Sequence, residues 1–157
     1  MAFKDITEVI SNIVVIIGLP LAVIQYFNES IKERKDRQYE IYSSMDEKFV
    51  EWEKLCLEYP DLDIHDVKDS IQPALTEKQK KQEVILFTIL FSIFERAYML
   101  YSDESTQLKK SQWTGWDQYI QDYCKRQNFR KAWNVSGSTF AMEFQSYMED
   151  KMKQTAK

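Results

Sequence analysis

Four basic residues near the end of the chain stand among aromatic ones: Lys125, Arg126, Arg130 and Lys131 are interleaved with Tyr119, Tyr123, Phe129 and Trp133. Cations bind phosphate, aromatic rings stack on bases, and a helix break at Gln127-Asn128 would expose backbone N–H groups. The candidate site for a small anionic ligand, such as a nucleotide, comprises Lys125, Arg126, Arg130, Lys131, Tyr123 and Trp133. The alternative is structural, because cations near a helix carboxyl end stabilise its dipole and aromatic residues at helical spacing usually form a core.

A second basic group, Lys78, Lys80 and Lys81, follows a predicted helix start. Cations in that position oppose the helix dipole, so contact with anionic lipid headgroups is an alternative to simple solvation.

The sequence gives little support for a metal site or for a catalytic site. His65 is the single histidine and lies among aspartates, but the EF-hand spacing fails because Asp66 stands where glycine is needed and Gln72 where glutamate is needed. A zinc site needs more His or Cys ligands. Nucleophilic catalysis needs a base beside the nucleophile, and neither a G-x-S-x-G motif nor a phosphate-binding glycine loop is present. We expect no metal, no cofactor and no enzymatic activity, and the net charge of −4 argues against nucleic acid as a bulk partner.

The elements that carry these residues begin with an uncharged apolar run from Val9 to Phe27. About 19 residues at about 1.5 Å each span roughly 28 Å, close to the thickness of a bilayer core. We interpret residues 1–27 as a transmembrane anchor, with a cleaved signal peptide and a buried or interfacial helix as alternatives. Four basic residues follow the run, namely Lys32, Arg34, Lys35 and Arg37. They place the amino terminus outside and the rest of the chain in the cytoplasm.

Beyond the anchor, the chain has only three glycines and three prolines and no alternating strand pattern, which predicts an all-α fold. We expect a charged juxtamembrane helix over 28–41 and a cytoplasmic domain over 42–157, a bundle of about four to five helices. Tyr42, Met45, Phe49, Trp52, Cys56 and Tyr59 follow a 3-4-3-4-3 spacing. This stripe predicts packing inside the domain, with a coiled-coil seam between protomers as the alternative.

Several boundaries follow from local signals. Pro60 ends one helix, and Thr76 with Gln79 forms a capping box that opens the next. The run Val84–Phe94 is apolar on nearly every side and too short to span a membrane, so we expect a central helix contacted all round. The remaining expected segments are a loop over 61–74, a polar turn over 102–111, a helix ending at Cys124, a short helix over 129–135 and a last helix over 139–153. Cys56 and Cys124 fall on apolar faces, which predicts reduced thiols.

The anchor, Tyr42, the segment L-C-L-E-Y-P at 55–60 and a distal aromatic series together resemble a loosely defined bacterial family of short single-pass membrane proteins with a helical cytoplasmic domain. The distal series comprises Glu95, Trp113, Trp116, Phe129-Arg130, Trp133, Phe140 and Phe144. The resemblance implies a location in the inner membrane. It assigns no function to any residue. The layout is also similar to small membrane effectors of bacterial defence systems, in which a cytoplasmic domain senses a signal and the anchor disturbs the membrane.

Two functions are therefore expected. The first is a membrane-anchored, non-enzymatic interaction or regulatory module whose partners are the lipid bilayer and another protein or a second copy of the chain. The alternative is a signal-gated membrane effector that binds a small anionic ligand through its cytoplasmic domain.

Overall fold

The structure is a computed structural model that describes residues 2–65 and 74–155, with side chains described from residue 21 onward. The described residues form five α-helices and one 3-10 turn, with no strand, which confirms the all-α prediction. The helices are α1 (Ala2–Glu58), α2 (Glu77–Tyr101), α3 (Gln107–Cys124), α4 (Gln127–Ser136) and α5 (Met142–Gln154), with the 3-10 turn η1 (Gly137–Thr139) between α4 and α5.

The chain divides into two structural units, Met1–Ser44 and Met45–Lys157. The first unit consists of α1 up to Ser44. The second contains the end of α1 together with all later helices, and it holds the whole hydrophobic core. The domain boundaries expected near residues 27 and 41 stay predictions.

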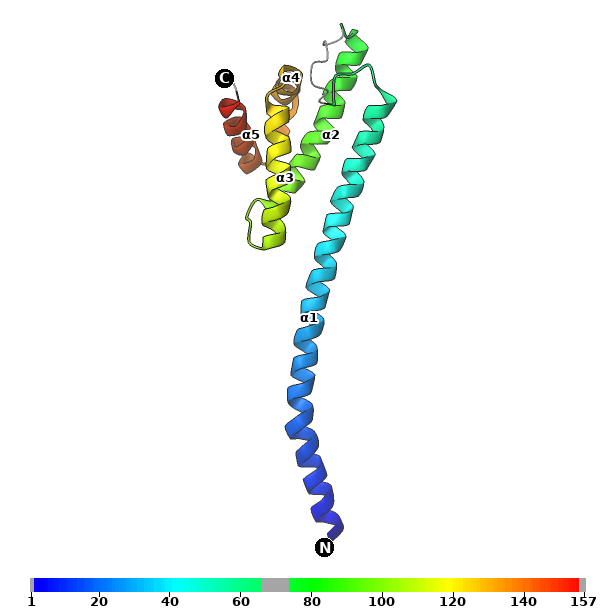
Figure 1. The fold of residues 1–157 in the computed structure, drawn as a ribbon, viewed down its shortest axis with the longest axis vertical. Helices are drawn as coiled ribbons and strands as arrows, with labels where there is room; N and C mark the ends of the chain where they lie inside the picture. Colours follow the sequence, from blue (N-terminus) through cyan, green and yellow to red (C-terminus); the bar gives the residue numbers. More distant parts are fainter. Residues whose placement is uncertain (1, 66–73, 156–157) are drawn as a thin grey trace. The chain divides into compact units, whose positions relative to one another are not determined.

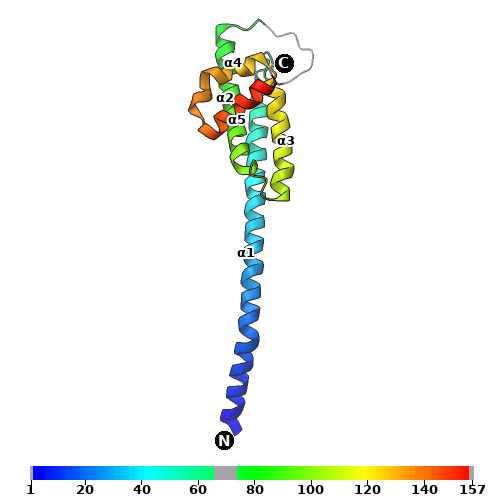
Figure 2. The same ribbon diagram turned by 90° about the vertical axis from the view of Figure 1, so that its left-hand side faces the viewer.

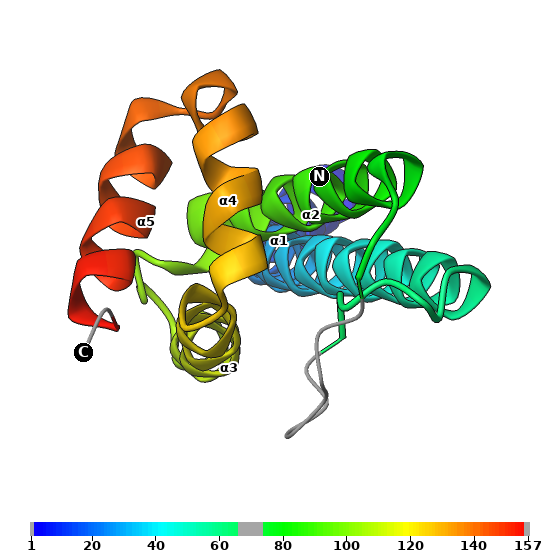
Figure 3. The same ribbon diagram turned by 90° about the horizontal axis from the view of Figure 1, so that it is seen from above.

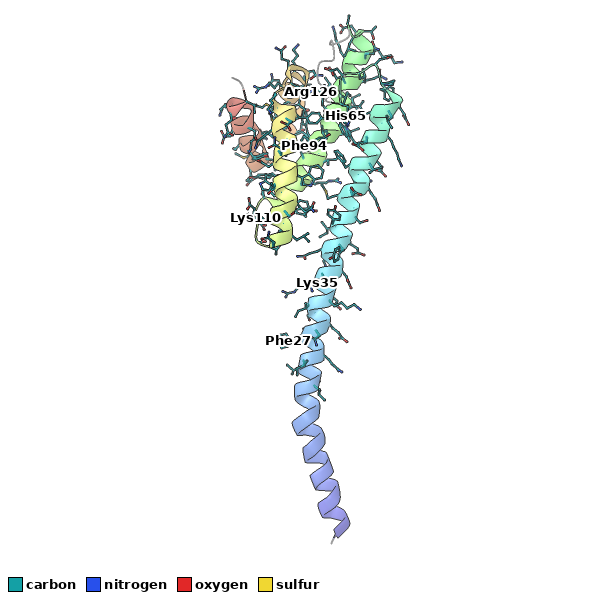
Figure 4. The ribbon with its side chains drawn as sticks, viewed as in Figure 1. Phe27, Lys35, His65, Phe94, Lys110 and Arg126 are labelled. Carbon is teal, nitrogen blue, oxygen red and sulfur yellow. The ribbon has the colours of Figure 1, made fainter. Side chains whose placement is uncertain are left out.

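In the first unit, apolar side chains lie open on α1. Every described side chain from Leu21 to Glu29 is exposed, and Figure 4 shows Phe27 projecting from the helix. The predicted anchor falls mostly on residues 1–20, whose side chains lie outside the description, so it stays a prediction.

The second unit is built around α2. Phe87, Phe91 and Phe94 are fully buried, and the ring of Phe91 lies 4.8 Å from that of Phe129, centroid to centroid. Figure 1 shows α2 and α3 side by side, and Figure 4 shows Phe94 between them. α2 is also the one helix in the described part of the chain with the length and hydropathy to cross a membrane, although buried residues along it pack against α3 and α4. A soluble core helix passes the same test.

The expectation that Val84–Phe94 is contacted on every side is wrong. Ile85 is 59% exposed, and Ile89 is exposed as well. α3 and α4 cover only part of the circumference of α2. The uncovered face runs through Ile85, Ile89, Ser92, Arg96 and Met99 at a 4-3-4-3 spacing.

The end of α1 packs into this unit through the predicted stripe. Trp52 is fully buried, and its indole N–H donates to the Leu86 carbonyl at 3.0 Å. The ring of Phe49 lies 5.6 Å from the rings of Trp116 and Tyr119. The stripe therefore packs inside the domain from Met45 to Cys56, as predicted, whereas Tyr42 and Tyr59 at its two ends are exposed.

The later helices enclose the opposite side of α2. Figure 3 shows α4 turning away sharply from the end of α3, and Figure 2 shows α5 lying over α2 and α3. Tyr98 of α2 joins them, since its ring lies 4.9 Å from that of Tyr147 and 5.7 Å from that of Trp113.

Side-chain caps fix where α2 and α3 begin. The capping box of Thr76 and Gln79 is confirmed. The polar turn is shorter than predicted, because the Thr106 side chain accepts from the backbone N–H of Lys109 and α3 starts at Gln107. The break falls at Lys125-Arg126, two residues earlier than predicted, and the last helix starts at Met142 because η1 occupies residues 137–139. Most of the expected loop over 61–74 lies outside the described residues.

Both cysteines are free thiols, as predicted. Burial raises the pKa of Cys56 to about 11 and that of Cys124 to about 12, so both thiols are protonated at neutral pH.

The turn after α4 depends on a glycine. A Cβ at Gly137 would lie 2.6 Å from the ring of Trp133. That ring is held between Phe91 and Phe140, with centroids 5.1 and 5.7 Å away. Trp133 therefore cannot move aside to make space for a Cβ at Gly137.

We expect Gly137→Ala to lower the free energy of unfolding by about 1–3 kcal/mol, the usual cost of overpacking. Gly115 is the matched control, because it is exposed in α3 and a Cβ there meets nothing within 4 Å. Gly115→Ala should raise the free energy by about 0.5–1 kcal/mol, since it removes backbone entropy from the unfolded chain. Urea unfolding followed by far-UV circular dichroism measures both, and equal effects of the two variants would contradict the packing described.

Candidate functional site

Arg126, at the start of α4, is largely buried and binds the turn that follows α1. Its guanidinium donates to the carbonyl oxygens of Asp63 and Ile64 at 2.6 and 2.9 Å. It also pairs with the Asp63 carboxylate at 2.8 Å and lies 5.4 Å from the centre of the Tyr123 ring. Figure 4 shows Arg126 and His65 at the same end of the second unit. The side chain therefore holds residues 63–64 against α4.

Arg130 joins the carboxyl ends of two helices. Its Nε donates to the Cys124 carbonyl at 2.6 Å, and its Nη2 donates to the Met152 carbonyl at 2.6 Å and to Thr155 Oγ1 at 2.9 Å. Carbonyls in the last turn of a helix lack intrahelical partners and carry partial negative charge. The Arg130 guanidinium therefore supplies hydrogen-bond donors to terminal carbonyls of both α3 and α5.

The other aromatic and basic candidates lie in the core or in surface ion pairs. Tyr123 is 1% exposed, and burial raises its pKa well above the usual range of a tyrosine. Trp133 is buried between Phe91 and Phe140. Lys125 pairs with Asp122 at 2.6 Å on the surface. Five of the six predicted site residues thus have structural contacts, and they do not converge on one open site.

Lys131, the sixth, lines a cleft of about 520 Å³ between the first part of α2 and the length of α4, and Asp63 also lines it. Lys80 and Glu83 of α2 line the same cleft, as does Asn128 of α4. Its apolar lining consists of Ala74, Leu75, Val84, Ala132 and Val135. The volume lies within the range of about 300–1,000 Å³ that is typical of ligand sites.

A buried amide connects the charges in this cleft. Asn128 is 8% exposed, and its Nδ2 donates to the Asp63 carbonyl at 2.6 Å and to Glu83 Oε1 at 3.0 Å. Burial raises the pKa of Glu83, against the hydrogen bond from Asn128 and the charges of Arg126 and Lys131, which lower it. Glu83 therefore holds its proton more tightly than an exposed glutamate does.

The cleft continues along α2 into a shallower hollow. Glu77, Lys81 and Ile85 line this second part, which shares Lys80, Val84 and Val135 with the first. The name α2–α4 groove is used below for the surface formed by Lys80, Lys81, Val84, Ile85, Lys131 and Val135. Val135 is 69% exposed, so the groove carries open apolar side chains between lysines.

His65 has structural neighbours. Its ring stacks against that of Trp52 at 6.5 Å, and its Nε2 lies 3.7 Å from the Glu53 carboxylate. Among the residues that the structure describes, no three His, Cys, Asp or Glu side chains form a group that could hold a metal ion.

Asp117 is another partly buried carboxylate with several partners. It accepts from the Tyr147 hydroxyl at 2.6 Å and pairs with Lys151 at 2.7 Å. Burial acts to raise the pKa of Asp117, but the bonds from Lys151 and Tyr147 outweigh it and lower that pKa. The carboxylate links α3 to α5 and stays ionised.

Comparisons with protein-family models, with curated proteins and with solved structures gave no match to this chain. The resemblance to bacterial single-pass membrane proteins and the anionic-ligand site both stay predictions.

Sequence reasoning singled out Lys131, and separately Lys80 and Lys81, but it did not bring them together in one groove. Asn128 and Glu83 lie 45 positions apart in the chain, and no local pattern relates them. The exposed face of α2 did leave a signal, because Ser92 and Arg96 continue the spacing of Ile85 and Ile89. Polar residues on that line mark the side of the helix that the core does not cover.

We expect Arg126→Met to lower the free energy of unfolding by about 2–4 kcal/mol, because it removes the cation that pairs with the partly buried Asp63 carboxylate and one hydrogen bond from each of two backbone carbonyls. The matched control is the neighbouring Lys125→Met, which removes a surface ion pair and should change the free energy by less than about 0.5 kcal/mol. Thermal and urea unfolding report both values. Similar stabilities for the two variants would show that Arg126 is not a structural clamp.

Proposed function

We propose that the chain is a non-enzymatic, membrane-tethered interaction module. Its first unit is held in the bilayer, and its second binds another protein on the cytoplasmic side. The observation that carries the tether is the continuous exposure of apolar side chains on α1, namely Leu21, Val23, Ile24, Tyr26 and Phe27. A soluble protein rarely leaves such a patch open to water, and this patch ends an uncharged run long enough to cross a bilayer.

The arrangement of charge in the second unit supports binding rather than catalysis. Arg126 and Arg130 hold backbone carbonyls, and Asp117 is held by Tyr147 and Lys151. Burial raises the pKa of Cys124, which makes its thiol a poor nucleophile. The exposed features that remain are apolar side chains and charged groups of both signs, which suit recognition of another molecule.

The orientation of the module follows from the basic residues after the apolar run. Lys32, Arg34, Lys35 and Arg37 stand immediately beyond it, whereas Lys4 is the single basic residue before it. Basic residues beside a span stay on the cytoplasmic side. This places the amino terminus outside the inner membrane and the second unit in the cytoplasm.

One observation favours a second candidate function, the signal-gated membrane effector. Lys80 and Lys131 stand on two walls of a cleft large enough for a small ligand. An anion bound between these lysines would be the signal. The groove has no aromatic ring among its described lining residues, however, so a base would find nothing to stack on.

We expect Ile17→Arg to release the full-length protein from membranes, because a charge near the middle of a span costs about 2.5–3.5 kcal/mol on insertion scales. The matched control is Ile31→Arg, which changes an exposed isoleucine of the same helix beyond the apolar run. Alkaline carbonate extraction and ultracentrifugation separate the fractions. The wild-type and Ile31→Arg proteins should pellet and Ile17→Arg should not. Extraction of the wild-type protein into the supernatant would contradict the tether.

A further inference from the structure

The exposed face of α2 carries side chains at a regular spacing that suits contact with another helix. Lys81, Ile85 and Ile89 recur at four-residue spacing and lie on one face of the helix. They cover about 12 Å along its axis at 1.5 Å per residue, which is slightly more than two helical turns. Ile85 and the neighbouring Val135 of α4 are among the more exposed apolar side chains of the second unit.

Three lysines and three carboxylates line the two hollows, and the Asp63 carboxylate among them pairs with Arg126 at 2.8 Å. Lys80 pairs with Glu77 at 2.8 Å. Lys81 and Lys131 have no ion pair with any residue that the structure describes. Glu83 is drawn inward by Asn128. Open apolar side chains bordered by two unpaired cations are complementary to an apolar surface bordered by acids.

The shape of the groove selects among possible occupants. It is hollowed, with a cleft of about 520 Å³, and a bilayer surface offers no projecting side chain to fill such a hollow. Its described lining contains no aromatic ring for a nucleotide base. A helix that projects one bulky apolar side chain between acidic ones fills the hollow and meets the lysines, which is the way amphipathic helices dock in grooves.

We propose that the α2–α4 groove binds an acidic amphipathic segment of a partner protein. The inference rests on the proposed function and supplies its binding surface and the chemistry of its partner. Apolar side chains of the segment contact Val84, Ile85 and Val135. Its carboxylates face Lys81 and Lys131.

The test is selection from a displayed library of random 16-residue peptides on the full-length protein in detergent micelles. Enriched peptides should combine Asp or Glu with Leu, Ile, Phe or Trp. Two double variants should weaken their binding by about 10-fold or more, as expected for central apolar and charged contacts. The variants are Ile85→Ser with Val135→Ser, and Lys81→Glu with Lys131→Glu. All four side chains are exposed, so both variants should keep the wild-type far-UV circular dichroism spectrum.

The matched control is Met142→Ser with Lys110→Glu, which changes an apolar side chain that is 79% exposed and an exposed lysine outside the groove. It should leave binding within about twofold, because surface contacts away from an interface contribute little. Lys110 lies near the start of α3 in Figure 4. Equal binding by control and groove variants would overturn the inference, as would enrichment of basic or uncharged peptides, or of none.

Competition experiments distinguish an acidic segment from the other possible occupants of the groove. ATP that displaces the selected peptides would overturn the inference in favour of the anion-gated effector. Displacement by phosphatidylglycerol vesicles would assign the groove to lipid, and selected peptides that match this chain's own sequence would assign it to a second copy. Carbonate extraction of the same proteins keeps the two proposals apart. If the protein stays in the membrane but selects no acidic peptide, the groove inference fails and the tether stands.

Discussion

The interaction on which the rest of the structure depends is the packing of three phenylalanines of α2, Phe87, Phe91 and Phe94, against Tyr123 and Phe129. Ring centroids in this cluster lie between 4.8 and 6.5 Å apart, and all five side chains are essentially inaccessible to solvent. Removing one buried phenylalanine side chain costs about 3–5 kcal/mol, a large part of the stability of a small domain. Because these residues commit one side of α2 to the core, the opposite side is left to carry Ile85 and Ile89. The same packing therefore creates both the core and the groove.

The basic residues of α4 show how one residue type serves structure and recognition in a short stretch of chain. Arg126 and Arg130 point inward and satisfy carbonyls at the ends of a turn and of two helices. A planar guanidinium with five donors can hold several oxygens at once, which a lysine cannot do with the same geometry. Lys131 follows directly, lies exposed and lines the groove. The division agrees with the chemistry of the side chains, since guanidinium groups tolerate burial better than strongly hydrated ammonium groups.

Sequence reasoning reached the fold class, the capping box at Thr76 and the burial of the stripe from Met45 to Cys56, because these follow from local spacing. It overestimated the burial of α2, since an apolar run does not reveal how many neighbours a helix will have. It also grouped the basic and aromatic residues of 123–133 as one site, whereas helical geometry sends Tyr123 and Trp133 into the core and Lys125 to the surface. The bond between Asn128 and Glu83 joins distant segments, so only the folded arrangement could show it.

The described part of the first unit carries exposed apolar side chains from Leu21 to Phe27, and the second unit combines an aromatic core with the open α2–α4 groove. We propose that such a chain acts as a membrane-tethered interaction module, and the central claim concerns what accompanies the protein when it is extracted from the membrane. Native mass spectrometry of the gently extracted full-length protein tests that claim most directly. The account predicts a single copy of the chain with no bound small molecule, alone or joined to another protein. A closed oligomer, or an added mass equal to that of a nucleotide, would contradict it and favour a gated effector.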